Sequence, residues 1–528
     1  MRIPEYRQTA LLEIGSLLVS VGDDQKAQEA YREILKTEPH NVVARLGLAD
    51  IFLSLSMLDE AGQMYLELSR DAPDNADIQL GLGECALHMG DFDAAYEALT
   101  AASSIRPDDA TIQFNLGQVM QHRGDYKAAE RLYRSAIAAL DGDPACATVW
   151  NKLGSLQSEQ GDWKKAEQSF RSAVSLLPNY PAALNNLAEV CRELGDLRTA
   201  EESFNAAVQA DDAYIPARYN RALFQLLLGR YENAWPDYDL RWQVPPLIND
   251  PRSLTPTLWQ GETLTGKSIL IHAEQGIGDT IQFLRFLPLL VTRDAEVTLA
   301  VQPGLMHIAS MLDRVTVRSL DDLPALTADY HCPLMSLAGR LGITAQTIPE
   351  PALIPLASED LKSQWRDLLS PSGRNIGICW QGNPHSAADR GRSPPLGAFQ
   401  AVAEIPGNHL ISLQKSHGLE QLDELDGAFS VTLNGATFDS GSNAFSDTIA
   451  LIELVDLVVT GDTAIAHLAA SMGKPTWIAL KHVPDWRWGT TGRSCPWYPS
   501  ATLFRQPSPD DWDSVFSSIA ERLAADGN

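Results

Sequence analysis

The sequence of 528 residues has few cysteines, and their spacing does not suit a metal site. The six lie far apart, without a Cys-x-x-Cys pair or a histidine at ligand spacing: Cys85, Cys146, Cys191, Cys332, Cys379 and Cys495. A zinc-binding or disulfide-stapled domain is therefore not expected. We expect reduced, structural thiols and no bound metal.

Long apolar runs and basic residues are also scarce. No stretch approaches the roughly 18 apolar residues of a membrane helix, and Arg2, Glu5, Arg7 and Glu13 interrupt the start in a way that signal peptides do not. The 41 Lys and Arg against 68 Asp and Glu give a net charge of −27, which repels phosphate backbones and anionic lipids. We expect a cytoplasmic protein that binds no nucleic acid and inserts into no membrane.

What the sequence does contain is a repeat with a period of 34 residues. The turn position of seven units is occupied by Gly22, Ser56, Gly90, Gly124, Gly161, Gly195 and Gly229. Five residues later stand Ala27, Ala61, Ala95, Ala129, Ala166, Ala200 and Ala234, and four beyond these Tyr31, Tyr65, Leu99, Tyr133, Phe170, Phe204 and Tyr238. Three extra residues near 141–145 lengthen one step to 37.

These units resemble the tetratricopeptide repeat. The fifth shows the pattern in full with Trp150, Leu153, Gly154, Gly161, Ala166, Phe170, Ala173 and Pro178. Small residues let the two helices of a unit approach closely, and stacked units bury a continuous core. The resemblance implies an all-α superhelix whose groove binds an extended peptide or a helix.

Asparagine recurs in the first helix of three units, as Asn115, Asn186 and Asn220. A side-chain amide can donate to a peptide carbonyl and accept from a peptide N–H, so this ladder is a candidate grip for a polypeptide acceptor. The alternative is that these amides serve the repeat itself.

A second architecture begins after a proline-rich segment, 242–257, that cannot continue a helix. The buried strand 268–273 leads into Gly276-Ile277-Gly278-Asp279 and an apolar helix. Ile281 replaces the third glycine of a dinucleotide motif, and the Asp279 carboxylate would repel a pyrophosphate, so NAD is not expected.

Asp279 is instead our candidate for a catalytic base that takes a proton from an acceptor. The alternative is an ordinary helix cap. Gly276 and Gly278 of the same turn, with Gln282 and Arg285 one or two turns on, complete the predicted acceptor site.

A second α/β unit opens with the strand 375–380, and polar residues follow at its carboxyl end, where open sheets bind ligands. Gln381, Asn383, Arg390 and Arg392 lie in this loop, and Lys415 follows the next strand. In an acidic chain these cations suit a diphosphate, although each alone is equally consistent with a solvated loop charge.

The last strand of interest, 457–460, leads into Asp462, Thr463 and a helix that carries His467. Asp462 and Thr463 can cap this helix, and Thr463 and His467 share one face because they are four residues apart. We expect a phosphate or ribose site here, although a lone helical histidine is more often structural.

Together, the Gly-x-Gly-Asp turn and the Asp-Thr…His segment resemble the bacterial heptosyltransferase-type glycosyltransferases, over 259–523. The family has the GT-B fold of two facing Rossmann-like domains. The resemblance implies that Asp279 activates the acceptor and that Asp462, Thr463 and His467 bind a sugar nucleotide. The sequence departs from the family with Ala464 in place of glycine and an arginine, Arg390 or Arg392, in place of a lysine.

The aromatic tail, with Trp486, Trp488, Trp497 and Tyr498, resembles the endings of bacterial proteins that join such repeats to a transferase domain. That group includes enzymes that glycosylate flagellins in the cytoplasm. The aromatic residues are expected either to stack on a base or sugar or to pack a domain edge.

We therefore predict an α plus α/β protein: seven repeats in 1–241, a linker in 242–257, an acceptor domain in 258–370 and a donor domain in 371–528. The predicted function is transfer of a sugar from a nucleotide sugar to Ser or Thr of a polypeptide held by the repeats, flagellin-like, without a metal or other cofactor. The alternatives are a transferase acting on an envelope saccharide, with the repeats as a docking module, and an inactive transferase-like scaffold.

Overall fold

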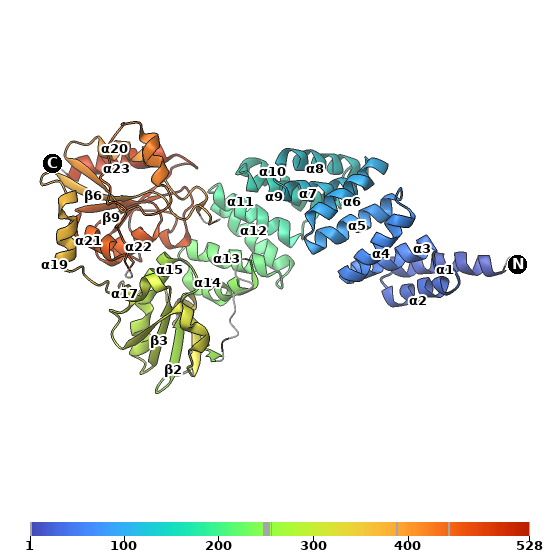
Figure 1. The fold of residues 1–528 in the computed structure, drawn as a ribbon, viewed down its shortest axis with the longest axis horizontal. Coiled ribbons are helices and arrows are strands. Elements are labelled where there is room, and N and C mark those ends of the chain that lie inside the picture. The colour runs from blue at the N-terminus through green and yellow to red at the C-terminus, as the bar shows by residue number, and fades with distance from the viewer. Residues whose placement is uncertain (1–2, 246–253, 255, 387–388, 442–443, 527–528) are drawn as a thin grey trace. The chain divides into compact units, whose positions relative to one another are not determined.

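Antiparallel helix pairs form the N-terminal part of the chain, as Figure 1 shows. The computed structural model describes residues 3–245, 254, 256–386, 389–441 and 444–526. Within 3–245 the helices are α1 (Ile3–Ser20), α2 (Asp24–Thr37), α3 (Val42–Ser54), α4 (Leu58–Asp71), α5 (Ala76–Met89), α6 (Phe92–Ile105), α7 (Ala110–His122), α8 (Tyr126–Leu140), α9 (Cys146–Glu159), α10 (Trp163–Leu176), α11 (Pro181–Glu193), α12 (Leu197–Ala210), α13 (Ile215–Leu227) and α14 (Tyr231–Tyr238). A 3-10 helix, η1 (Asp239–Gln243), follows.

The period read from the sequence sets the geometry of each pair. All seven turn residues have positive φ, between 59° at Ser56 and 80° at Gly22 and Gly161. The seven alanines are all 0% exposed, and the seven residues four positions on are at most 5% exposed. Each unit therefore turns at its glycine position and buries the same two side chains, as the sequence predicts.

Close approach between helices explains the glycines in the first helix of several repeats. A Cβ built at Gly81 would come 2.3 Å from the Tyr65 ring of the preceding unit. A Cβ at Gly154 would come 2.6 Å from the Phe170 ring of its own unit. The aromatic residue thus fills the space that the missing side chain leaves, which requires a glycine at these positions.

Two units pack separately, residues 1–190 and residues 191–528. The second contains the last repeats together with both α/β domains. The boundaries drawn from the sequence after residues 241, 257 and 370 remain predictions, and most of the predicted linker, 246–253 and 255, lies outside the described residues.

The first α/β domain is a parallel sheet in the order β1-β5-β2-β3-β4. Its strands are β1 (Thr257–Leu258), β2 (Ser268–His272), β3 (Glu296–Val301), β4 (Val315–Ser319) and β5 (Tyr330–Pro333). Its helices are α15 (Ile277–Phe283), α16 (Leu287–Val291), α17 (Met306–Ala309) and α18 (Leu337–Arg340). Buried runs such as Ile269–Ile271 are typical of parallel strands covered on both faces.

The second α/β domain is a parallel sheet in the order β10-β9-β8-β6-β7. Its strands are β6 (Arg374–Cys379), β7 (Asn408–Ser412), β8 (Leu457–Thr460), β9 (Thr476–Leu480) and β10 (Ala501–Arg505). Its helices are α19 (Glu359–Trp365), α20 (Gln400–Ala403), α21 (Ser446–Leu454), α22 (Ala464–Ser471) and α23 (Trp512–Asp526). The core on one face joins Ile378 and Val459 to Phe399 and Phe516.

Each sheet has a point where the strand order reverses. In the first, β3 and β5 flank β2, and in the second, β7 and β8 flank β6. A crevice opens beside the carboxyl end of the central strand at such a point. The loops after β2, β6 and β8 therefore carry the residues that reach the site.

The seventh repeat, α13 and α14, packs on both α/β domains. The Trp235 indole N–H in α14 donates to the Ile343 carbonyl of the first domain at 2.7 Å. The Trp497 indole N–H of the second domain donates to the Tyr231 hydroxyl at 3.1 Å. The tail aromatics are buried, with Trp488 and Trp497 1% exposed and Tyr498 0% exposed, so the aromatic cluster packs rather than lying open for stacking.

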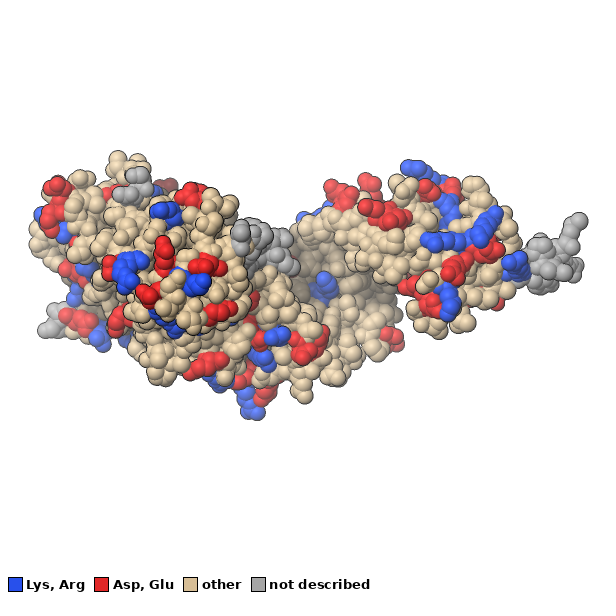
Figure 2. Space-filling view, turned by 90° about the horizontal axis from the view of Figure 1, so that it is seen from below, with Lys and Arg blue, Asp and Glu red and all other residues tan. Residues whose placement is uncertain are grey.

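Acidic and basic side chains are interspersed on the face seen in Figure 2. Within the first unit, Arg45 pairs with Asp71 at 2.9 Å and Arg106 with Asp77 at 2.6 Å, in each case between the two helices of one repeat. None of the described helices has both the length and the hydropathy needed to cross a bilayer.

Candidate functional site: a cavity between two parallel sheets

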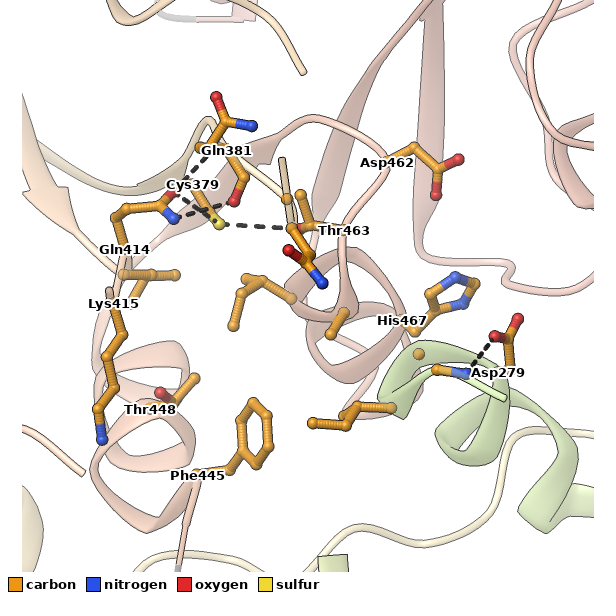
Figure 3. A pocket seen from close by; sticks show the side chains of 18 of the residues that line it. Asp279, Cys379, Gln381, Gln414, Lys415, Phe445, Thr448, Asp462, Thr463 and His467 are labelled. Atoms are coloured by element: carbon orange, nitrogen blue, oxygen red, sulfur yellow. Dashed lines mark hydrogen bonds between the residues drawn. The ribbon is translucent and has the colours of Figure 1, made fainter. Parts of the chain in front are cut away.

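A cavity of about 680 Å³ lies where the loops of the two α/β domains face each other (Figure 3). Its lining comes from 275–279 after β2, from Cys379, 381–383 and Arg392 at and after the end of β6, from 413–416 after β7, from Asp439, Ala444, Phe445 and Thr448, from 462–465 and His467 after β8, and from Asp485 and Arg487 after β9. Asp279 and His467 lie toward one side of the view in Figure 3, and Lys415 lies toward the other.

Most of the residues singled out in the sequence meet at this cavity. Those that line it are Gly276, Gly278, Asp279, Gln381, Asn383, Arg392, Lys415, Asp462, Thr463 and His467. The structure brings them together from loops more than 180 residues apart in the chain. It does not bring in Gln282, Arg285, Arg390, Asn115, Asn186 or Asn220.

Asp279 has a partner at each carboxylate oxygen. Its Oδ2 accepts the Gly276 backbone N–H at 2.9 Å, which is the helix-capping contact. Its Oδ1 accepts a hydrogen bond from Arg487. The side chain is 22% exposed, so one face of the carboxylate remains accessible to an acceptor from the cavity.

Arg487 is the main functional residue that the sequence analysis did not assign. Its side chain is 7% exposed and also donates to Asp485 at 2.7 Å and to the Gln282 amide oxygen at 2.5 Å. Burial disfavours its charge, but the Asp279 and Asp485 carboxylates outweigh burial and raise the pKa of the guanidinium. The available signal was an arginine between two tryptophans in an acidic chain.

His467 is a neutral side chain with a fixed orientation. Its Nδ1 lies 2.9 Å from the Tyr498 hydroxyl, and the residue is 4% exposed. Burial lowers its pKa well below the usual 6.5, and the nearby Arg487, Arg285 and Arg392 lower the pKa further. A neutral imidazole acts here as a hydrogen-bonding group rather than a cation.

Gly278 allows the two domains to approach at this point. A Cβ at Gly278 would lie 2.8 Å from His467 Cδ2 and 3.5 Å from the Ala464 backbone. Helices α15 and α22 pack against each other here. The glycine of the Gly-x-Gly-Asp turn is therefore required for domain contact as well as for the turn.

Asp462 and Thr463 lie at the start of α22 but do not cap it as expected. Thr463 occupies the N-cap position without a side-chain cap bond, because its hydroxyl lies 3.0 Å from the Thr460 hydroxyl. Burial raises the pKa of Asp462 to about 6, although the Arg392 charge acts in the opposite direction. Without a side-chain cap, the first amides of the helix are left available to a ligand.

Two cations also line the cavity. Arg392 is 24% exposed and its contact with Asp389 is 3.3 Å long. Its buried Nε has no hydrogen-bond partner among the described residues. Lys415 lines the same cavity and donates to the Asp439 carbonyl. A buried guanidinium donor without a partner is suited to a phosphate oxygen.

Gln414 organises the loop after β6, and the sequence analysis did not recognise it. Its Oε1 accepts the backbone N–H groups of Trp380 and Gln381, each at 3.0 Å, and its Nε2 donates to the Gln381 carbonyl at 2.9 Å. It thereby ties the loop after β6 to the end of β7. Gln381 itself donates to Asp389 at 2.7 Å.

Gln282 and Arg285 are buried between the domains instead of lining the cavity, which corrects the expectation that they reach the cleft. They are 0% and 1% exposed. Arg285 donates to the Trp497 carbonyl at 2.7 Å and lies over the Tyr498 ring. Gln282 therefore contacts Arg487, and Arg285 contacts the packed aromatic tail, instead of the cavity. Arg390 is exposed outside the lining.

The asparagine ladder bonds to neighbouring repeats. Asn115 donates to Glu84 of the preceding unit at 2.8 Å, and Asn186 donates to Asn151 at 3.0 Å. Such bonds between repeats are what we expect if the amides have a structural role in the repeat array. Peptide binding by Asn115, Asn186 and Asn220 stays a prediction.

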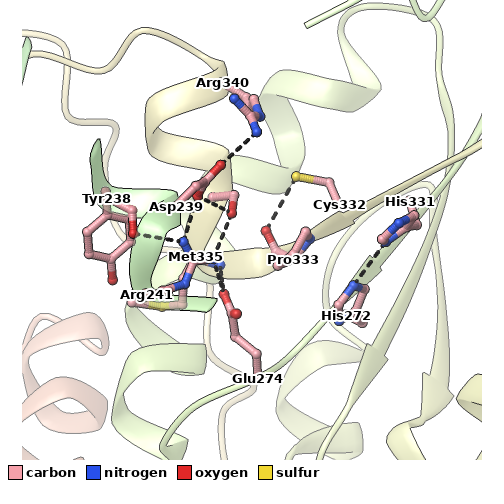
Figure 4. A network of polar contacts seen from close by, with 11 residues as sticks. Tyr238, Asp239, Arg241, His272, Glu274, His331, Cys332, Pro333, Met335 and Arg340 are labelled. Atoms are coloured by element: carbon pink, nitrogen blue, oxygen red, sulfur yellow. Dashed lines mark hydrogen bonds and ion pairs between the residues drawn. The ribbon is translucent and has the colours of Figure 1, made fainter. Parts of the chain in front are cut away.

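The loop that leads from β2 into α15 is anchored by a buried ion pair (Figure 4). Arg241 of η1 and Glu274 are 0% and 1% exposed and lie 2.8 Å apart. Arg241 also bonds the Ser336 hydroxyl at 2.7 Å, and Arg340 holds Asp239 at 2.6 Å. The segment after the last repeat is thus part of the support of the Gly-x-Gly-Asp turn.

A metal ligand set is absent from the described residues, where no group of three or more His, Cys, Asp or Glu side chains is placed to hold an ion. The expectation that the protein needs no metal stays a prediction. All six cysteines are buried thiols.

The fold and the cavity define a repeat protein with a module of two parallel sheets, and family models match the repeats and part of the second sheet's domain. Tetratricopeptide-repeat models match 18–85, 74–141, 108–179 and 146–213. The model described as glycosyltransferase family 9 (heptosyltransferase) matches 410–506. The chain therefore carries tetratricopeptide repeats and a family 9 glycosyltransferase domain, and this second match includes Lys415, Asp462, Thr463, His467 and Arg487.

Protein FlbA of Caulobacter vibrioides is 26% identical over 332 residues, which cover 58% of this chain and 54% of that protein. The chain thus spans about half the length of this curated relative. Among solved structures, PilF of Pseudomonas aeruginosa is 17% identical with a TM-score of 0.37, over 41% of this chain and 98% of that one. YrrB, a TPR protein, is 16% identical with a TM-score of 0.31, over 37% and 100%.

Proposed function

We propose that this chain is a glycosyltransferase that moves a sugar from a nucleotide sugar to a Ser or Thr hydroxyl of a polypeptide. One observation carries the proposal: Asp279 of the first sheet and Asp462, Thr463 and His467 of the second line a single cavity. A base from one domain and a nucleotide site from the other are what a two-domain transferase needs. The family 9 match at 410–506 supports the donor side.

The donor's phosphate groups are placed beside Arg392, Lys415 and the uncapped start of α22. These groups would stabilise the negative charge that develops on the phosphate as the glycosyl bond breaks. His467, neutral and fixed by Tyr498, would donate or accept one hydrogen bond to the donor. Gln381 and Asn383, which follow the carboxyl end of β6, line the same cavity.

In the proposed reaction the acceptor hydroxyl oxygen forms a bond to the anomeric carbon of the sugar. The hydroxyl proton passes to Asp279, the bond between the anomeric carbon and the phosphate oxygen breaks, and the nucleotide leaves with that electron pair. Arg487 holds Asp279 in place through one oxygen. The neighbouring Gly276 N–H holds the other oxygen.

The acceptor side of the proposal is a polypeptide bound by the repeats. The seventh repeat packs on both α/β domains through Trp235 and Tyr231, so a chain bound along α13 would be delivered to the cavity. A flagellin-like protein in the cytoplasm is the acceptor that the sequence resemblance suggests. An envelope saccharide is the competing acceptor.

The first experiment is isothermal titration of the full chain with UDP, GDP, CDP, CMP and ADP. Micromolar binding of one nucleotide, lost in Asp462→Ala and His467→Ala, would support the donor site. His307→Ala, on α17 and outside the cavity lining, is the matched control and should bind like the parent. No binding of any nucleotide would contradict a transferase and favour a scaffold.

The acceptor class is tested by supplying the matching radiolabelled nucleotide sugar with purified flagellin or with a lipopolysaccharide core oligosaccharide. Label in the flagellin that is released by β-elimination would identify a Ser or Thr link. Label in the oligosaccharide alone would overturn the polypeptide acceptor while leaving the transferase intact.

A further inference from the structure

The His467 ring is held on three sides. Its Nδ1 lies 2.9 Å from the Tyr498 hydroxyl, and its ring centroid lies 5.1 Å from that of Trp488. The edge formed by Cδ2 and Nε2 faces Gly278, because a Cβ built there would lie 2.8 Å from Cδ2 and 3.4 Å from Nε2. His467 and Gly278 both line the large cavity. With Nδ1 occupied by Tyr498, Nε2 is the ring nitrogen that is left for a ligand.

The hydrogen bond between His467 and Tyr498 has two possible directions. Either the Tyr498 hydroxyl donates to a bare Nδ1, or a protonated Nδ1 donates to the hydroxyl oxygen. Burial and the nearby arginines lower the pKa of His467, so the imidazole is neutral and carries one ring proton. A neutral ring with a bare Nδ1 has that proton on Nε2. The direction of this bond therefore decides whether Nε2 donates to a ligand or accepts from it.

Arg285 favours donation by the Tyr498 hydroxyl. Its guanidinium carbon lies 4.8 Å from the centroid of the Tyr498 ring, and its buried Nη2 has no hydrogen-bond partner among the described residues. A guanidinium has donors and no acceptor, so the cation attracts the lone pairs of the hydroxyl oxygen and repels the hydroxyl hydrogen. Burial raises the pKa of Tyr498, and the Arg285 charge opposes that rise. The hydroxyl hydrogen is thus directed toward Nδ1 of His467.

Arg487 is a second cation close to His467, and its hydrogen bonds point elsewhere. Each of its three nitrogens already donates to a side-chain oxygen: Nε to Gln282, Nη1 to Asp485 and Nη2 to Asp279. None of these bonds requires a bare Nε2 on His467. A proton on Nε2 is therefore compatible with the contacts of both arginines.

We propose that Tyr498 and Arg285 are positioning residues that hold His467 as the tautomer with its proton on Nε2. The proposal rests on the proposed function and deepens it, because it states which group of the sugar nucleotide His467 recognises. A protonated Nε2 donates a hydrogen bond and cannot accept one, so its partner is an acceptor atom of the donor substrate.

The acceptor atom that fits this position is a diphosphate oxygen. His467 stands in the first turn of α22, and helical side chains lean toward the N-terminus of their helix. Thr463 leaves the first amides of the same helix without a side-chain cap. The amides and the Nε2 proton are therefore placed to bind one anion, and an N–H bond to a charged oxygen is stronger than one to a neutral acceptor.

The two positioning residues come from different domains. Arg285 lies in the 3-10 helix η3 (Leu284–Phe286) of the first α/β domain, and its Nη1 donates to the Trp497 carbonyl of the second domain at 2.7 Å. Tyr498 directly follows Trp497, so this bond fixes the cation beside the phenol. The position of one proton in the donor site thus depends on a residue of the other domain.

The tautomer is measured by NMR on the full chain without nucleotide, from proton–nitrogen correlations of isotope-labelled histidine rings. The signals of His467 are those missing from His467→Gln. We expect a single Nε2-protonated form in the parent. In Tyr498→Phe and in Arg285→Gln the two nitrogen shifts should move toward each other, because the other tautomer becomes populated. Tyr133→Phe is the matched control, since it also removes a fully buried hydroxyl bonded to a side chain, and it should keep the parent signals.

The ligand group is identified by calorimetric titration with the nucleoside diphosphate that binds the parent and with the matching nucleoside. We expect His467→Ala to weaken diphosphate binding by at least about tenfold and Tyr498→Phe by at least about threefold, the effects of a lost and a weakened hydrogen bond. Nucleoside binding should stay within about twofold in both variants. Tyr133→Phe should leave both affinities within about twofold.

A proton on Nδ1 in the parent would overturn the proposal, and this spectrum carries the test if circular dichroism shows that Tyr498→Phe does not fold. Parent-like shifts in Tyr498→Phe or in Arg285→Gln would overturn the positioning role of that residue. Equal losses of nucleoside and diphosphate binding in His467→Ala would overturn the phosphate oxygen as its partner. A parent that binds no nucleotide overturns the proposed function separately, because the tautomer is measured without nucleotide.

Discussion

Arg487 and Asp279 form an ion pair across the two α/β domains although 208 residues separate them in the chain. Arg487 also pairs with Asp485, so one buried guanidinium is shared by two carboxylates with different positions. Only Asp279 lies at the Gly-x-Gly-Asp turn. Substituting each aspartate in turn can therefore distinguish a catalytic base from a counter-ion of Arg487.

We expect Asp279→Asn to reduce sugar transfer by about 10²–10⁴-fold, the contribution typical of a general base. Nucleotide affinity should stay within about twofold, because Asp279 belongs to the first α/β domain and the proposed donor groups belong to the second. Asp485→Asn is the matched control, since it also removes a carboxylate from Arg487. Equal losses of transfer in both variants would show that Asp279 acts as a counter-ion only.

Arg392→Met should weaken binding of a nucleoside diphosphate by roughly tenfold, because a guanidinium with a free buried donor faces the cavity. Binding of the matching nucleoside, which lacks phosphate, should not change. Arg390→Met is the control from the same loop and should leave both affinities within about twofold. Calorimetric titration with the two ligands measures the difference.

Asp462 should make the protein less stable at neutral pH. Its folded pKa of about 6 lies above the usual value of 3.8, so the folded state holds the proton more tightly between these values. The stabilisation that this gives is present below about pH 4 and is lost as the pH rises through 6.

Asp462→Asn should therefore be more stable than the parent at pH 7.5, by at most about 3 kcal/mol, and equally stable near pH 4. Urea unfolding followed at both pH values checks this. The same variant should bind nucleotide more weakly. A stability difference that is independent of pH would contradict the assignment.

Gly278→Ala should disturb the contact between α15 and α22. The new methyl group would meet the His467 ring, which the Tyr498 hydroxyl holds in place. We expect a loss of about 1–3 kcal/mol and weaker nucleotide binding, measured by urea unfolding and titration. Gly397→Ala, where a Cβ meets nothing within 4 Å, should change neither.

Removing Arg241 should destabilise the second unit strongly, because Glu274 would remain buried without its cation. Arg241→Met is expected to cost about 3–5 kcal/mol, seen as a shift in the unfolding transition followed by tryptophan fluorescence. Arg340→Met is the milder control, since its partner Asp239 is 29% exposed. Arg241→Met combined with Glu274→Leu should recover part of the loss. If the double variant recovers no stability, the broken ion pair is not the source of the destabilisation.

The repeat register could be predicted from the sequence alone because its signal is local and repeated. Seven turn residues and seven alanines at a fixed spacing specify where each helix pair turns and which face it buries. The loops of the large cavity were also predictable, since glycine and aspartate after a buried strand indicate the carboxyl edge of a parallel sheet. Asp279, Asp462 and Thr463 were found in this way.

The tertiary structure decided which of these residues meet and which neighbours they acquire. Gln282 and Arg285 follow Asp279 closely in sequence, yet α15 and the 3-10 turn after it direct them into the packed aromatic tail. Arg487 has no local motif, and its position beside Asp279 depends on docking one sheet against another. Local spacing determines the helix face and the strand edge, whereas a contact between residues 208 apart depends on how whole domains pack.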